Sequence, residues 1–140
     1  MSRCVSQYDF CIPQGTDLTV PFRLKDSEGK AIDLHGYTVR MQVRKFAVSD
    51  VCIDDLTTEN GRIALDEAEG TFTLTFPNKV TEAYPVGDVV YDIELVSADD
   101  FVTRIVEGSI RVLSEVTRGN TQGSGGYGGA SIAGNSANYR

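Results

Sequence analysis

Hydrophobic and polar residues alternate along several short stretches of this chain, and the longest such stretch is residues 88–113. In its first half, apolar side chains occupy every second position, at Val89, Tyr91, Ile93 and Leu95. A period of two is typical of a β-strand with one buried face. Residues 97–100 are polar and can bond the local backbone, so a hairpin turn is predicted there. Gly108, inside the return strand, marks a bulge or the close approach of another backbone.

Other stretches alternate as regularly and predict strands at residues 18–24, 37–43 and 71–76. Residues 5–12 form a less regular first strand, which Pro13 ends. Pro21 has no N–H to donate, so its strand is expected at a sheet edge or with that position facing solvent. These strands and the hairpin are predicted to share one core, made by Leu18, Val20, Phe22, Val39, Met41, Val43, Phe72, Leu74, Phe76, Tyr91, Ile93 and Leu95.

Turn signals separate the predicted strands. Asn60 and Gly61 both tolerate a positive φ, so a hairpin is predicted between strands at residues 51–56 and 62–65. Asn78 is expected to cap a single helical turn over residues 79–84.

About seven or eight short strands at this spacing, with no long helical period, are typical of an all-β sandwich. The sequence therefore predicts an immunoglobulin-like antiparallel β-sandwich over residues 1–113.

The composition changes after the last strand, where residues 114–140 contain seven of the chain's 14 glycines. Such a segment cannot bury enough apolar surface to offset its ordering entropy, so it is predicted to be an extended arm that becomes ordered only on a neighbouring subunit. Its partner-binding residues are predicted from the few sizeable side chains in the last twenty residues: Tyr127, Ile132, Tyr139 and Arg140.

Charge and composition narrow the function classes. The 140 residues carry a net charge of -7, which argues against general nucleic-acid binding because that needs a basic face. No run approaches the roughly 20 apolar residues of a membrane helix, and no secretory signal is expected. The cysteines Cys4, Cys11 and Cys52 lack a CxxC spacing and are interpreted as reduced thiols rather than as a disulfide framework or zinc site.

Candidate chemistry is sparse. The single histidine, His35, lies in a predicted loop, and the acidic pairs at residues 54–55 and 99–100 are assigned to solvated turns. No catalytic residue, cofactor site or metal site is predicted. Polar and charged side chains on the outward faces of two strands are interpreted as solvent-facing groups, in preference to a polar docking face: Arg40, Gln42, Arg44, Asp92 and Glu94. The charged ones are expected to pair if the two strands adjoin.

A family resemblance follows from the order of several segments: residues 8–17 (YDFCIPQGTD), 22–44, 56–63 (LTTENGRI), 70–76 (GTFTLTF), 90–95 and 102–112. Over residues 8–113 the chain resembles the immunoglobulin-like N-terminal domain of phage baseplate upper proteins. The resemblance implies a non-enzymatic virion protein, made in the host cytoplasm, that acts as an adaptor between tail and receptor-binding parts. Its expected partners are other virion proteins, with no nucleic acid and no membrane.

Two alternatives remain open. A capsid decoration protein would use the same sandwich and arm on a head lattice. A carbohydrate-binding module is less favoured, because the chain has no Trp to form a sugar platform. An enzyme is the weakest interpretation.

Overall fold

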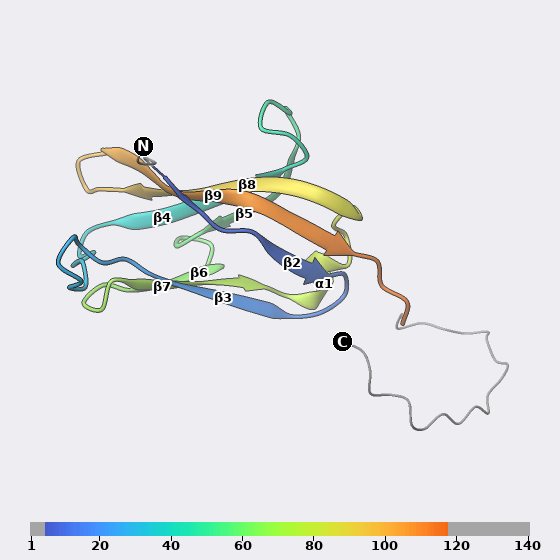
Figure 1. Cartoon of the computed structure of the whole chain (residues 1–140), viewed down its shortest axis with the longest axis horizontal. Coiled ribbons are helices and arrows are strands. Elements are labelled where there is room, and N and C mark those ends of the chain that lie inside the picture. The colour runs from blue at the N-terminus through green and yellow to red at the C-terminus, as the bar shows by residue number, and fades with distance from the viewer. Residues whose placement is uncertain (1–4, 118–140) are drawn as a thin grey trace, which may run out of the picture.

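Two β-sheets pack face to face in the computed structural model, which describes residues 5–117 (Figure 1). The elements are β1 (Ser6–Gln7), β2 (Phe10–Pro13), β3 (Leu18–Arg23), β4 (Thr38–Arg44), β5 (Cys52–Thr57), β6 (Ile63–Asp66), β7 (Thr71–Phe76), α1 (Asn78–Thr81), β8 (Gly87–Val96) and β9 (Val102–Leu113). The larger sheet has the order β1-β9-β8-β4-β5, with β2 also paired to β9, and the smaller sheet has the order β3-β7-β6. The predicted all-β, immunoglobulin-like sandwich is therefore confirmed.

The core is the one that the alternation predicts. Nine of the twelve predicted core side chains are buried, while Leu18, Phe22 and Leu95 are partly buried and pack against them. Strand β7 shows the reason, because Phe72, Leu74 and Phe76 all point inward while the threonines between them stay partly exposed. A period of two along a strand places every second side chain on the same face.

The β8–β9 hairpin forms at the predicted turn. The Ser97 hydroxyl accepts hydrogen bonds from the N–H groups of Asp99 and Phe101, and Asp100 adopts a φ of 65°. The ladder shifts register after Ile93, which leaves Ile105 as the extra residue of a bulge. The bulge therefore lies at Ile105, three residues before the glycine that the sequence marks.

Gly108 instead allows the close approach of another backbone, the second possibility that the sequence raised. A Cβ at this position would lie 1.9 Å from the carbonyl oxygen of Tyr8. The same oxygen accepts a hydrogen bond of 2.6 Å from the Tyr91 hydroxyl. The carboxylate of the following residue, Asp9, accepts a hydrogen bond from the Ser109 N–H, and this bond lowers the pKa of Asp9. The N-terminal strand is thus held tightly on β9.

That strand also departs from the purely antiparallel arrangement. It is split into β1 and β2, which both run parallel to β9. The split falls at residues 8 and 9, where the Asp9 side chain replaces a backbone group in the ladder. Alternation along one strand carries no information about the direction of its neighbour, so the sequence pattern could not predict this pairing.

Pro21 lies at a sheet edge, as predicted, because among residues 5–117 β7 is the one strand that pairs with β3. The Leu24 N–H bonds the carbonyl of Gly70, which precedes the neighbouring strand. Every second residue of an antiparallel strand bonds the same neighbour, so the backbone nitrogen of Pro21, three positions earlier, faces away from β7. The missing N–H of proline removes one backbone donor that an added strand could bond at this edge.

The predicted hairpin at Asn60-Gly61 is wrong. Strand β5 belongs to the larger sheet and β6 to the smaller one, so this turn connects the two layers. Gly61 does have the expected positive φ, at 81°. Asn60 and Gly61 therefore specify a local bend. The packing of the whole domain decides which sheet each of the two flanking strands joins.

Asn60 also covers the open edge of β5. The Thr58 N–H bonds the Val39 carbonyl of β4. Because every second residue bonds the neighbouring strand, the backbone groups of residues 55 and 57 face away from β4, toward the open edge of the sheet. The Asn60 side chain meets both, accepting from the Thr57 N–H and donating to the Asp55 carbonyl, each at 3.0 Å. An unpaired edge strand can bond a strand of another chain and so promote aggregation. The Asn60 side chain bonds the backbone groups that such a strand would use.

We expect Asn60→Ala to lower the free energy of unfolding by about 1–2 kcal/mol, because several backbone groups lose their partner. It should also raise the rate of aggregation on heating, since the β5 edge becomes available. Urea denaturation and light scattering measure the two effects. The control is Thr58→Ala, because the Thr58 hydroxyl bonds the exposed Glu59 side chain and no backbone group of residues 5–117. Equal behaviour of both variants would contradict edge protection.

The helical turn is shorter than predicted and Asn78 does not cap it. Helix α1 starts at Asn78 itself, after Pro77 at the cap position, and Pro77 has no side-chain group that could cap the helix. Asn78 instead donates its backbone N–H and its amide to Asp17, which ties α1 to the turn before β3. A carboxylate brought close by the fold has taken the role that a local cap was expected to fill.

Candidate partner-docking surfaces

The four side chains predicted to bind a partner, Tyr127, Ile132, Tyr139 and Arg140, lie outside the described residues, as does most of the 114–140 arm. Their role stays a prediction. On the sandwich, three features bear on docking: a charged sheet face, an ion pair between the sheets and an exposed apolar loop.

The charged face is the outer surface of the larger sheet. Arg40 and Glu94 are direct cross-strand neighbours on β4 and β8, with Arg40 Nε 2.8 Å from the Glu94 carboxylate. Arg104 on β9 lies 3.3 Å from Asp92 and 3.5 Å from Glu107. The expected cross-strand pairing is therefore confirmed for Arg40 and Glu94, whereas Asp92 pairs with Arg104 and not with Arg44. Each exposed pair contributes roughly 0.2–1 kcal/mol.

A shallow groove of about 860 Å³ runs over this face and is lined by charged side chains of both signs. Partial burial raises the pKa of Asp92, against the opposing effect of Arg104. Arg44 is bonded to uncharged groups, the Ser49 carbonyl at 3.0 Å and the Gln42 amide oxygen at 2.6 Å. Most of the charge on this face is thus matched within the sheet.

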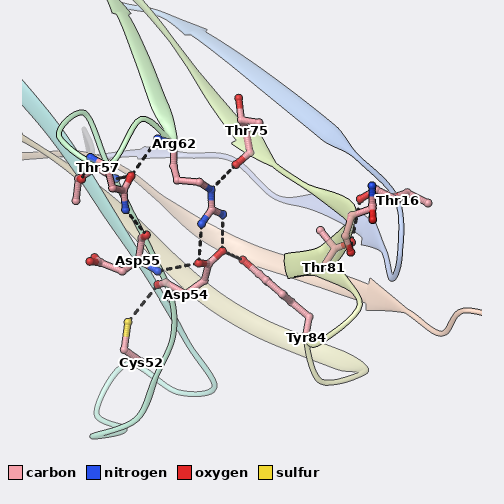
Figure 2. A network of polar contacts seen from close by, with 11 residues as sticks. Thr16, Cys52, Asp54, Asp55, Thr57, Arg62, Thr75, Thr81 and Tyr84 are labelled. Carbon is pink, nitrogen blue, oxygen red and sulfur yellow. Dashed lines mark hydrogen bonds and ion pairs between the residues drawn. The ribbon is translucent and has the colours of Figure 1, made fainter.

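An ion pair joins the two layers at one end of the sandwich (Figure 2). Arg62, just before β6, donates through both terminal nitrogens to the Asp54 carboxylate of β5, at 3.1 and 2.8 Å. The Asp54 side chain is only 8% exposed and that of Arg62 17%. Arg62 Nε also donates to the Thr75 carbonyl of β7 at 2.8 Å. The guanidinium therefore ties an edge of the larger sheet to the middle strand of the smaller one.

Tyr84 completes this network. Its hydroxyl donates to Asp54 Oδ2 at 2.7 Å, and its ring is buried in the core. Burial, followed by the bond to the Asp54 carboxylate, raises the pKa of Tyr84 well above its ordinary value. The phenol therefore stays protonated over the physiological range and serves as a fixed donor. The arrangement is that of a structural clamp between the sheets.

The clamp is linked to the start of the arm. Gln14, in the turn after β2, donates its amide to the Tyr84 carbonyl at 2.7 Å and accepts from the Glu115 N–H at 3.0 Å. Its own N–H bonds the Leu113 carbonyl at 2.9 Å. Gln14 therefore holds the chain in place for two residues beyond the end of β9.

The apolar loop, residues 45–51, connects β4 and β5 and rises above the larger sheet (Figure 1). Phe46, Val48 and Val51 are 62%, 90% and 68% exposed. The loop is nevertheless defined by bonds of its own, because the Ser49 N–H donates to the Phe46 carbonyl and the Arg44 guanidinium donates to the Ser49 carbonyl. It presents three apolar side chains within six residues on a fixed backbone.

The other candidate residues are not brought together. His35 is exposed and bonds Glu67 at 3.1 Å, while Cys11 and Cys52 are exposed free thiols. Within residues 5–117 no group of three or more His, Cys, Asp and Glu side chains is placed to hold a metal ion. Among the same residues no helix is long and apolar enough to cross a membrane.

The clamp and the loop were not predicted from the sequence. Asp54 was expected to be solvated at or near a turn, whereas its carboxylate is nearly buried on β5. An acidic pair inside a predicted strand, with an arginine eight positions after Asp54, is the local signal of this ion pair. For the loop, the apolar residues between 45 and 51 were a visible signal, since loops are usually polar.

Comparison of the chain with known proteins finds similarity among solved structures. No protein-family model matches the sequence, and no curated protein matches it. Among solved structures, CopC from Methylosinus trichosporium OB3b is similar with a TM-score of 0.42 and 10% identity, covering 83% of this chain and 90% of that chain.

Proposed function

We propose that this chain is a non-enzymatic structural protein of a phage virion. In this role it is an adaptor of the tail, baseplate or fibre attachment that docks on neighbouring subunits through its sandwich and its C-terminal arm. The assignment to virions comes from the resemblance of residues 8–113 to the phage baseplate domain.

The observation that carries the docking role is the apolar loop on a rigid support. Exposed apolar side chains that cluster are typical of protein–protein interaction sites. Here Phe46, Val48 and Val51 gather on one loop whose backbone is fixed by hydrogen bonds. The inter-sheet clamp supports the same role, since an adaptor under load needs its two layers tied together.

The proposal is tested with a chain truncated after Arg118. We expect the truncated protein to keep its free energy of unfolding within about 0.5 kcal/mol, because the deleted residues follow the sandwich. It should be lost from purified virions on washing, while the full-length chain is retained. Thermal melts and quantitative immunoblots of washed particles measure the two results. Equal retention of both proteins would contradict docking through the arm.

The position on the particle is tested separately by immunogold labelling of intact virions. Gold at the tail supports the adaptor, and gold spread over the head would assign the chain to capsid decoration instead. Absence of the chain from purified particles would overturn a virion role altogether.

A further inference from the structure

The apolar side chains of the loop are exposed to solvent and are not part of the core. Phe46 and Val48 point no side chain into the core, yet the turn that carries them is closed by the Ser49–Phe46 backbone bond of 3.0 Å. Val51 is fixed by a bond of 3.2 Å from its N–H to the Ser49 hydroxyl. A surface that is ordered in advance loses little entropy on binding, which favours a docking role.

The start of the arm is equally well fixed, and it leads away from this loop. Gln14 holds Leu113 and Glu115 against the turn after β2. In Figure 1 the loop rises on one side of the larger sheet, while residues 114–117 leave β9 toward the other side. The arm of a given copy therefore starts in a direction that favours a neighbouring sandwich over its own loop.

Charge adds a second reason for arm and sandwich to meet. Residues 118–140 contain Arg118 and Arg140 and no acidic residue. Because the whole chain carries -7, these two arginines leave -9 on residues 1–117. A basic segment is attracted to an acidic body. Within the loop the exposed Lys45 and Asp50 balance each other, so this attraction comes from the sandwich as a whole and the apolar side chains supply the local contact.

We propose that the apolar loop, residues 45–51, is the acceptor for the C-terminal arm of a second copy of this chain, with Tyr127 packing against Phe46. This inference rests on the proposed virion role and names the surface that the arm binds. Thr117 and Tyr127 are ten residues apart and span at most about 36 Å when extended, which is enough to reach an adjacent sandwich. A contact between an arm and a different surface is head-to-tail, and such contacts close into rings when the rotation between copies allows.

Sedimentation of the full-length protein over a range of concentrations tests the contact. We expect concentration-dependent self-association that Phe46→Ser and Tyr127→Ser each weaken by about tenfold or more, since each removes an aromatic side chain from the interface. The matched control is Phe101→Ser, because Phe101 is 72% exposed on the β8–β9 hairpin, away from the loop. It should leave association unchanged.

The double variant, Phe46→Ser with Tyr127→Ser, shows whether the two side chains meet. If they pack together, the double variant is weakened little more than either single variant, because the shared contact is lost only once. Full additivity, an equal effect of Phe101→Ser, or a full-length chain that stays monomeric at about 1 mM would overturn the inference. If virion retention depends on the arm but the protein does not self-associate, the adaptor role is still supported and only the contact between arm and loop is contradicted.

Discussion

Asp54→Ala is expected to lower the free energy of unfolding by about 3 kcal/mol or more. The substitution leaves the Arg62 guanidinium mostly buried without its carboxylate, and removing one partner of a buried ion pair typically costs 3–5 kcal/mol. Arg62 retains only the Thr75 carbonyl and a distant contact with the Phe76 ring, whose centroid is 6.0 Å from its central carbon. Tyr84 loses the acceptor of its hydroxyl at the same time.

Urea denaturation of the variant measures this loss, with Glu94→Ala as the matched control. Glu94 also pairs with an arginine, but on the solvent-facing side of the larger sheet, with side-chain exposures of 50% for Arg40 and 27% for Glu94. Its removal should cost less than about 1 kcal/mol. If the two substitutions destabilise the protein equally, Asp54 is not the clamp between the sheets that its burial indicates.

Gly108→Ala is expected to destabilise the protein by about 2–3 kcal/mol, in the upper part of the range for overpacked cores. The new Cβ would lie 1.9 Å from the Tyr8 carbonyl oxygen, which is backbone and cannot rotate away. Strand β1 must therefore move off β9, and the hydrogen bond from Tyr91 to Tyr8 is lost with it. Ile12, fully buried on β2, is displaced if the movement spreads along the chain.

Amide hydrogen exchange distinguishes this local effect from a general loss of stability. We expect protection to fall first for the N–H groups of Tyr8 and Gln14, which bond β9 and its end, while the β4–β8 ladder keeps its protection. Thr103→Ala is the control, because Thr103 is an exposed residue of the same strand, at the end away from Tyr8. Unchanged protection of the N-terminal strand in Gly108→Ala would contradict the close approach.

The sequence by itself determined the strands, their inward faces and the β8–β9 turn. These properties depend on the nearest neighbours along the chain: the alternation of Phe72, Leu74 and Phe76 selects a face, and Ser97 bonds the backbone of its own turn. The edge position of β3 followed from Pro21 for the same reason, since the missing N–H is a property of one residue. Nothing beyond the local chemistry was needed for these features.

Tertiary structure alone decided which sheets the strands join and which polar side chains become buried. Asn60-Gly61 specifies a bend, but whether the bend closes a hairpin or crosses between layers depends on the packing of strands that lie far away in the sequence. Asp54 and Arg62 form a clamp only because the two layers close over them, and Tyr84 arrives there from a segment that follows α1. Contacts between distant segments are set by the free energy of the whole core, so no local pattern in the sequence records them.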